Sequence, residues 1–374
     1  MHQSSVLAEP AVLVNRRTQL RLPMIDIAKG FGILLIVLGH NTLFVDNFEM
    51  FSRTLTSFRL PFFFFVSGVT LSLGDGNLRR IVIERADAWL KPCAVVIVFV
   101  GVAKIFAGTA SLENLLVGLS FGAGFTLAWP PLWFLPHLWL VYSCSAAVLI
   151  VAKGWLASPL SRIALLGGCA AGGFYLVHMF DTPYQNEICV KQLHFSMRLF
   201  ECGLPFSADL LLITCFFFFA GYFMSARVRG FRPGITQALC ALMCLVLMRQ
   251  AFPVKLDLNG RLYDDLLITP LEALFGIYVM LCLCFVLSRS VNISRFFGYF
   301  GRVSLFILIF HAPVLYTMLR VLPRWLHSDL TVGSAAYVIA IGTSISLYYI
   351  FRSSRLLSTL MFAQKANRHH QQAT

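Results

Sequence analysis

The chain has 374 residues, of which 58% are hydrophobic and only 13% charged, and its net charge is +13. Because a soluble domain is about 25% charged, this composition excludes a soluble globular protein and predicts an integral membrane protein. The 30 Lys and Arg residues occur in small groups at the ends of apolar runs, which argues against the continuous basic surface of a nucleic-acid-binding protein.

Apolar runs long enough to cross about 30 Å of hydrocarbon predict an all-α integral membrane protein, a bundle of about ten transmembrane helices. The predicted spans are 25–45, 58–75, 93–110, 131–152, 160–179, 207–225, 234–252, 267–288, 302–320 and 330–351. Most Lys and Arg residues outside the spans then lie in segments on the same side of the membrane as the two chain ends. The positive-inside rule therefore places both termini in the cytoplasm.

Three parts of the chain follow from these spans. We expect a cytoplasmic N-terminal segment at 1–24, a membrane domain at 25–351 and a cytoplasmic tail at 352–374. The polar composition of the tail predicts disorder. The protein is accordingly expected in the inner (cytoplasmic) membrane, where it crosses the lipid many times.

The first predicted span holds three ionisable residues, Asp26, Lys29 and His40. A charged group deep in a bilayer costs about 2.5–3.5 kcal/mol and needs a partner or a water-filled cavity. Asp26 and Lys29 are three residues apart and can form an ion pair. Lys29 and His40 are eleven residues apart, which in a helix is about 16 Å along the axis and about 20° beyond three full turns, so both face one side. The structural alternative is that Lys29 reaches the interface and His40 bonds a neighbouring helix.

The second predicted span begins "FRLPFFFFVSG", with Arg59 one turn inside an apolar segment and Pro61 freeing a backbone carbonyl. Arg59 either has an anionic partner or reaches the outer interface. The basic stretch after this span holds Arg79, Arg80 and Arg85. These side chains either bind an anionic group or serve only as cytoplasmic anchors.

Two segments before the fifth span combine aromatic and polar residues. Segment 109–130 is apolar and glycine-rich but contains Glu113 and ends in Trp-Pro-Pro, so we expect it at the outer face or as a re-entrant piece. The sequence "PLWFLPHLWL", 131–140, follows with Trp133 and His137. Anchoring at the membrane interface explains Trp133 at least as well as stacking on a substrate does.

The predicted outer loops carry the residue types that bind sugars. Segment 180–206 mixes acidic, basic, amide and aromatic residues, and 253–266 adds Asp257. Such side chains hydrogen-bond hydroxyls and stack on sugar rings, although polar loops are expected outside any membrane. Cys189 and Cys202 share the first loop and pair if that face is oxidising; the sequence leaves this open. No spacing of Cys, His and acidic residues predicts a metal site.

Five motifs follow one another along the chain. They are the Lys29-x10-His40 spacing, "RLPFFFFVSG" with "NLRRIVIERADAWLKP", "PPLWFLPHLWLVY", "LPFSADLLLITCFFFFAGYFM" and "GRVSLFILIFHAPVLY". In this order they resemble the acyltransferase 3 family of integral membrane acyltransferases, over roughly 24–320. The fourth motif and "KLDLNGRLYDD" are most similar to its fucose 4-O-acetylase-like branch. One departure is Phe306, where the family pattern has a tyrosine, so a hydroxyl role is absent there.

The resemblance implies ten helices and acyl transfer from cytoplasmic acyl-CoA to carbohydrate hydroxyls of envelope or secreted glycans. Lys29 and His40 correspond to the family's functional pair, and His311 matches a family histidine. Attack by a hydroxyl needs a base, and histidine titrates near neutral pH, so His40 is expected to be the base or to accept the acyl group transiently. Arg59 would stabilise the oxyanion. The predicted catalytic residues are therefore His40, Arg59 and His311.

The predicted donor is acetyl-CoA, with no metal ion. Its phosphates would bind the cations near the cytoplasmic surface, which are Lys29, Arg79, Arg80 and Arg85. Trp133 and Asp257 are the candidate residues for binding a carbohydrate or lipid-linked glycan. The sequence thus predicts a membrane O-acyltransferase, above all an O-acetyltransferase.

The same buried groups also fit a different class, a membrane transporter or exporter of a sugar, glycan or anion with His40 as a proton relay. Dependence on acyl-CoA separates the two classes, because an exporter needs none. A third interpretation is a non-catalytic partner in a glycan synthesis complex. The sequence leaves open which glycan and which hydroxyl are acylated, which acyl group is moved, whether an acyl-enzyme forms, and what the oligomeric state is.

Overall fold

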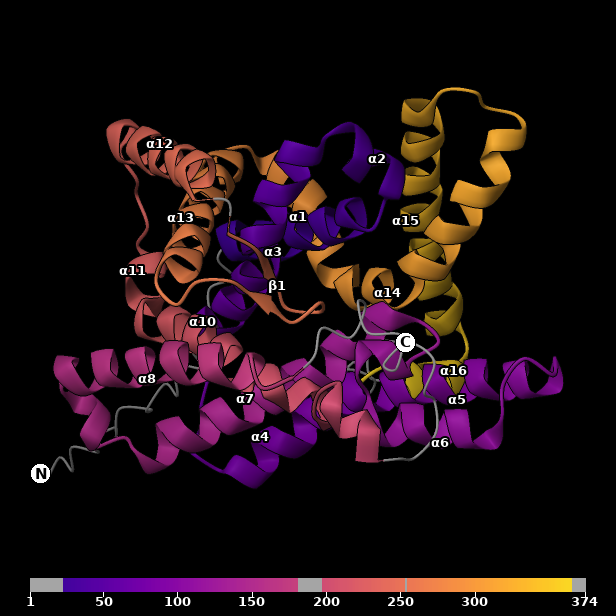
Figure 1. The fold of residues 1–374 in the computed structure, drawn as a ribbon, viewed down its shortest axis with the longest axis horizontal. Coiled ribbons are helices and arrows are strands. Elements are labelled where there is room, and N and C mark those ends of the chain that lie inside the picture. The colour runs from indigo at the N-terminus through magenta and orange to yellow at the C-terminus, as the bar shows by residue number, and fades with distance from the viewer. Residues whose placement is uncertain (1–22, 181–196, 253, 365–374) are drawn as a thin grey trace, which may run out of the picture.

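The computed structural model describes residues 23–180, 197–252 and 254–364, which are almost entirely helical (Figure 1). The helices are α1 (Pro23–Gly39), α2 (Thr42–Asn47), α3 (Glu49–Val69), α4 (Leu78–Arg85), α5 (Lys91–Phe106), α6 (Leu112–Phe121), α7 (Phe134–Val151), α8 (Pro159–Val177), α10 (Leu211–Phe223), α11 (Ser225–Arg229), α12 (Ile235–Ala251), α13 (Ile268–Ser288), α14 (Val291–Val321), α15 (Asp329–Ser353) and α16 (Arg355–Met361). One short hairpin, β1 (Leu256–Asp257) and β2 (Leu262–Tyr263), connects α12 and α13. Short 3-10 turns and a π-helix, Ala86–Leu90, join several of the helices.

Seven helical segments among the described residues are long and apolar enough to cross a membrane, which confirms a multi-pass helical membrane protein. The remaining predicted spans, 25–45, 58–75 and 234–252, correspond to α1, α3 and α12. α1 and α12 have 17 residues each, and α3 carries three charged residues. The α-helix of segment 109–130 is the 10-residue α6, which is too short to span, and a 3-10 turn, Gly124–Thr126, follows it.

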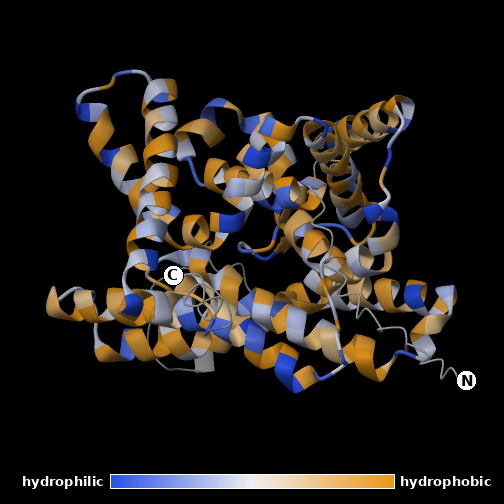
Figure 2. Ribbon diagram, turned by 180° about the vertical axis from the view of Figure 1, so that it is seen from behind, coloured by the Kyte–Doolittle hydropathy of each residue, from blue (hydrophilic) through white to orange (hydrophobic). Residues whose placement is uncertain are grey.

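The helices form two groups. In Figure 1, α4 to α8 with α16 make a lower layer, and α1, α2, α3 and α12 to α15 stand above it. α10 connects the groups because it packs on α3 as well as on α7 and α8. Hydrophobic residues run along all these helices (Figure 2), and much of the core is built from buried phenylalanines.

α1 and α14 pack side by side and in the same direction. Near the start of α1, a Cβ on Gly30 would overlap the carbonyl of Phe297, and its near neighbours include the backbone of Gly301. Glycine is therefore required there for the two backbones to approach so closely. At the other end of the pair, His40 meets His311.

The predicted boundaries of the first two spans were wrong. α1 ends at Gly39 because Asn41 begins a new helix: its side chain accepts a hydrogen bond from the Phe44 amide and donates one to the carbonyl of Gly333. His40 therefore lies in the turn after α1, not inside a continuous span. α3 begins at Glu49, which puts Arg59 in the middle of its helix rather than near an end.

The predicted tail, 352–374, also differs from the expected disorder in part. Residues 355–361 form α16, which packs on α5, and Met361 is fully buried. Lys91 donates to the carbonyl of Phe362 at 2.7 Å, and the Gln364 amide donates to Asp87 at 2.7 Å. Hydrogen bonds and apolar contacts thus hold this part of the tail, for which polar composition alone suggested solvent.

A buried ion pair fixes the β1–β2 hairpin to the segment before α10. The Nε of Arg261 lies 2.8 Å from the carboxylate of Asp209, and both side chains are almost inaccessible. Asp209 also accepts a hydrogen bond from the Leu204 amide. The intervening residues Phe206 and Ser207 both have positive φ, a strained conformation that surrounding contacts must maintain.

Replacement of Arg261 by methionine is expected to lower the free energy of unfolding by about 3–5 kcal/mol, because it leaves the Asp209 carboxylate buried without its partner. The measurement is equilibrium unfolding in detergent micelles. Arg53→Met is the control, since Arg53 pairs with Glu49 in solvent and should change stability by less than about 1 kcal/mol. Equal effects of the two variants would contradict a stabilising role for the buried pair.

Candidate active site

The two predicted catalytic histidines meet at the end of the α1–α14 pair. The rings of His40 and His311 lie 5.3 Å apart between centroids, tilted by 47°. The Nδ1 atom of His40 is 3.2 Å from the hydroxyl of Tyr316 on α14. Tyr316 therefore joins the site, although it was not singled out in the sequence; its place in the motif "HAPVLY", five residues after His311, was the available signal.

His311 is buried and has one ring nitrogen available for chemistry. Its Nδ1 donates to the carbonyls of Ile307 and Leu308 at 2.8 and 3.0 Å, which fixes the proton on that nitrogen. Its Nε2 is consequently an acceptor, and within the described residues it has no hydrogen-bond partner. Because a buried unpaired acceptor is destabilising, this nitrogen marks a position where a substrate hydroxyl or a protonated group can bind.

Arg59 reaches the same place from α3. Its guanidinium lies against the backbone of Gly39, so closely that a Cβ on this glycine would overlap Nη1. β1, which holds Asp257, packs on α3, the helix of Arg59. The structure thus brings Arg59 and the proposed sugar-binding Asp257 toward the histidine pair, although the two residues are nearly 200 positions apart in the chain.

A cavity of ≈ 490 Å³ lies farther along the same helices, toward the start of α1. Its walls come mainly from α1, α3, α7 and α14. Its polar and aromatic lining residues include Asp26, Lys29, Ser67, Thr70, Arg85, Trp89, Tyr142, Arg229 and Ser304. Three cations in one cavity are suited to binding a multiply charged anion by charge-assisted hydrogen bonds.

The structure separates the arginines that the sequence grouped together. Arg85 lines the cavity, donates to the Tyr142 hydroxyl at 2.9 Å, and lies over the rings of Trp89 and Tyr142. Arg79 and Arg80 are exposed and do not line it. Arg80 pairs instead with Asp75 at 3.0 Å and with Glu84 at 3.6 Å.

Arg229 of α11 is the cavity cation that was missed. It belongs to a short basic group after a predicted span, with Arg227 and Arg232, and it was interpreted only as a marker of topology. The available signal was that this group lies on the same predicted side as Lys29 and Arg85. Which member of it turns into the cavity depends on tertiary packing.

Trp133 and His137 are packed inside the protein. Trp133 is 4% exposed and contacts the ring of His137, so it does not anchor a lipid interface. Each ring nitrogen of His137 has a hydrogen-bond partner: Nδ1 lies 3.0 Å from the Phe206 carbonyl and Nε2 lies 3.1 Å from the Thr214 hydroxyl. Trp129 packs on Phe310, the neighbour of His311 in the chain.

These features define a multi-pass helical membrane protein in which a cationic cavity and the His40–His311 pair lie along the same two helices, α1 and α14. The acyltransferase domain of the acyltransferase 3 family matches residues 22–351, and the chain belongs to this family. The match includes every predicted catalytic and donor-binding residue and confirms the resemblance at the level of the family. No curated protein and no solved structure matched the chain.

Proposed function

We propose that this protein transfers an acyl group, above all acetyl, from cytoplasmic acyl-CoA to a sugar hydroxyl of an envelope or secreted glycan, as in the fucose 4-O-acetylase-like branch of the family. The observation that carries the proposal is the juxtaposition, along α1 and α14, of a cationic cavity with the His40–His311 pair. A donor with phosphates at one end and a reactive thioester at the other requires such an arrangement.

The cavity supplies the donor's phosphate-binding groups. Lys29, Arg85 and Arg229 present ammonium and guanidinium donors to it. Guanidinium groups bind phosphate oxygens through two parallel hydrogen bonds. The aromatic rings of Trp89 and Tyr142 add flat apolar surface beside Arg85, which suits the adenine ring.

The histidine pair supplies the proton transfer. His40 takes the proton of the sugar hydroxyl as its oxygen attacks the thioester carbonyl. The neighbouring Nε2 of His311, an acceptor, stabilises the imidazolium that forms. The Arg59 guanidinium stabilises the oxyanion of the tetrahedral intermediate. When the intermediate collapses, the carbon–sulfur bond breaks and the CoA sulfur receives the proton from His40, so the enzyme returns to its starting state.

The acceptor is proposed to approach from the hairpin side, with Asp257 near Arg59. Cys202 is disulfide-bonded, and disulfides form in oxidising compartments, which supports an outward orientation of this side. Cys189 and residues 181–196 of the predicted outer loop lie outside the described residues. The donor cavity, toward the opposite end of α1, then faces the cytoplasm, in agreement with the positive-inside rule.

Radiolabelled acetyl-CoA tests the proposal with purified protein in lipid nanodiscs and a panel of sugars and glycan fractions. Label that moves to a glycan supports the enzyme. Absence of transfer, together with no measurable affinity for CoA in correctly folded protein, would favour the transporter.

Arg85→Gln and Arg229→Gln are each expected to weaken CoA binding about tenfold, since each removes one charge-assisted phosphate contact. Titration calorimetry in nanodiscs measures the change. Arg79→Gln is the matched control, because Arg79 is exposed and does not line the cavity. An equal loss of affinity in the control would show that the arginines act only through the general field of the surface.

A further inference from the structure

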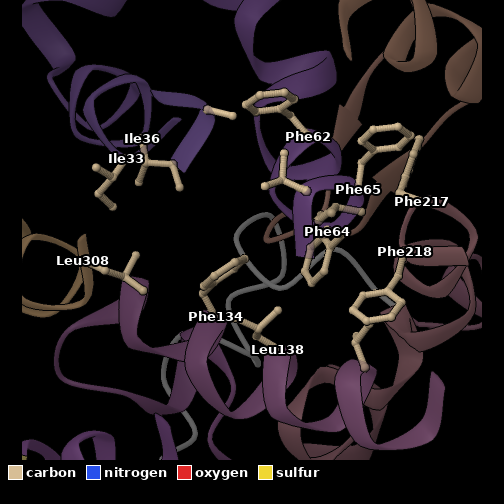
Figure 3. Close-up of a cluster of buried hydrophobic side chains, with 14 of the residues drawn as sticks. Ile33, Ile36, Phe62, Phe64, Phe65, Phe134, Leu138, Phe217, Phe218 and Leu308 are labelled. Atoms are coloured by element: carbon tan, nitrogen blue, oxygen red, sulfur yellow. The ribbon is translucent and has the colours of Figure 1, made fainter. Parts of the chain in front are cut away.

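One wall of the cationic cavity is not part of the packed core. The lining side chains from α7 and α14 include Phe134 and Leu308, which belong to a cluster of buried hydrophobic residues (Figure 3). Arg85 and Trp89 form another wall. Trp89 lies in the π-helix Ala86–Leu90, none of whose residues is buried. Core packing therefore contributes less to the position of this wall than to the rest of the cavity.

The π-helix follows from the sequence around Pro92. Proline has no amide hydrogen, and its ring collides with the carbonyl four residues earlier, which here belongs to Ala88. The helix widens at this point, so that the Lys91 amide donates to the carbonyl of Ala86, five residues back. Turns of this kind are rare and occur frequently at functional sites. A wider turn holds one residue more than an α-helical turn, so the direction of Trp89 depends on its being kept.

The C-terminal segment, residues 361–364, is attached to both ends of this π-helix. The Gln364 amide donates to the carboxylate of Asp87 at 2.7 Å, and Lys91 donates to the carbonyl of Phe362, also at 2.7 Å. Asp87 and Lys91 pair with each other at 2.6 Å, and neither lines the cavity. Asp87 is two residues from Trp89, a spacing that puts side chains on different sides of a helix. The C-terminal segment thus contacts the π-helix on the side away from the cavity.

The same segment is anchored in the core. Met361 is fully buried, and the ring of Phe362 stacks on Phe306 of α14, with 5.1 Å between centroids and 25° between planes. α16, which precedes the segment, packs on α5 and α15. Because α14 also lines the cavity, the C-terminal segment connects two of the cavity walls.

We propose that the C-terminal segment positions Arg85 and Trp89 for the donor, so that docking of this segment and binding of acyl-CoA are coupled. The inference rests on the proposed function, since it takes acyl-CoA as the occupant of the cavity. It goes beyond that function because it makes donor affinity depend on a segment outside the cavity. Asp87 and Lys91 are positioning residues that act through the π-helix. By linkage, acyl-CoA must favour docking of the segment as much as docking favours acyl-CoA.

Gln364→Pro and Lys91→Met test the inference, because each removes one attachment. Proline deletes the amide hydrogen that Asp87 accepts and leaves every side chain of the cavity in place. Each variant is expected to weaken CoA binding about fivefold, the effect of one lost hydrogen bond. Titration calorimetry of the full-length protein in nanodiscs measures it. The transfer rate at saturating acetyl-CoA should stay within about twofold of wild type, because only binding of the donor is affected.

Gln364→Ala is the matched control for the proline variant, since it removes the side chain at the same position and keeps the amide hydrogen. Arg53→Met is the control for Lys91→Met, because it also breaks an ion pair between residues four apart, in this case an exposed pair with Glu49 on α3. Both controls should bind CoA as the wild type does. Unfolding midpoints identify the folded variants, and either test variant suffices.

Hydrogen exchange measures the reciprocal effect in the wild type. Saturating CoA should slow exchange in the peptide that contains Gln364, because the donor favours the docked segment. Unchanged CoA affinity in the folded test variants, equal losses in the controls, or exchange of this peptide that does not respond to bound CoA would overturn the inference. Absence of CoA binding to the wild type would instead reject the proposed function, and the inference with it.

Discussion

Replacement of His40 by glutamine is expected to lower the rate of acyl transfer about 10³-fold, while the affinity for CoA stays within about twofold of wild type. General-base catalysis contributes about 10²–10⁴-fold, and glutamine keeps the polarity and approximate size of the side chain without accepting a proton. CoA binding is spared because His40 does not line the cationic cavity. Single-turnover transfer from radiolabelled acetyl-CoA, with calorimetric CoA binding, measures both quantities.

His137→Gln is the control for this prediction. His137 is another histidine of the membrane domain, but it is fully buried and both of its nitrogens have protein partners. Its replacement should lower stability and leave the rate per folded molecule within about threefold, because the group has no part in the proton transfer. A His40→Gln enzyme that keeps more than about a tenth of the wild-type rate would reject His40 as the base.

Hydropathy determines much of the fold, which is why most helices could be predicted from the sequence. A segment in lipid must satisfy its backbone hydrogen bonds internally, so a long apolar run has few alternatives to a helix. The ionisable residues of the site could be recognised for the same reason. Lys29 and His311 stand in apolar runs, where an ionisable side chain is costly and needs a partner. Helix ends were less predictable: α1 stops at Gly39 because Asn41 bonds the carbonyl of Gly333, nearly 300 residues away in sequence.

The sequence predicted the types of residue in the candidate site, but not which individual residues form it. Arg79, Arg80 and Arg85 are the same residue type in one basic stretch, so the sequence does not distinguish them. The packing of α4 on α7 turns Arg85 toward Tyr142 and the cavity. Arg229 enters the cavity through α11, which no pattern in the sequence connects to α1. The contact of Arg59 with Gly39 is likewise tertiary.

Gly39→Ala is expected to lower the transfer rate about 10²-fold or more without unfolding the protein. The added methyl would occupy the position of the Arg59 Nη1 atom, so the guanidinium must move away from the site, and loss of one oxyanion donor costs about 10²–10³-fold. Alanine is a better helix former than glycine, so local stability gives no reason for a loss. Single-turnover transfer measures the rate, and the unfolding midpoint reports the fold.

A double-mutant cycle separates displacement of Arg59 from other effects of the methyl group. In an Arg59→Gln background, Gly39→Ala should cause little further loss, because the group that it displaces is already absent, and the two effects will be far from additive. Gly342→Ala on α15 is the control, since a Cβ there meets nothing within 4 Å, and it should leave the rate unchanged. Additive losses in the cycle would show that Gly39 acts independently of Arg59, and the guanidinium would then lose its place in the proposed oxyanion site.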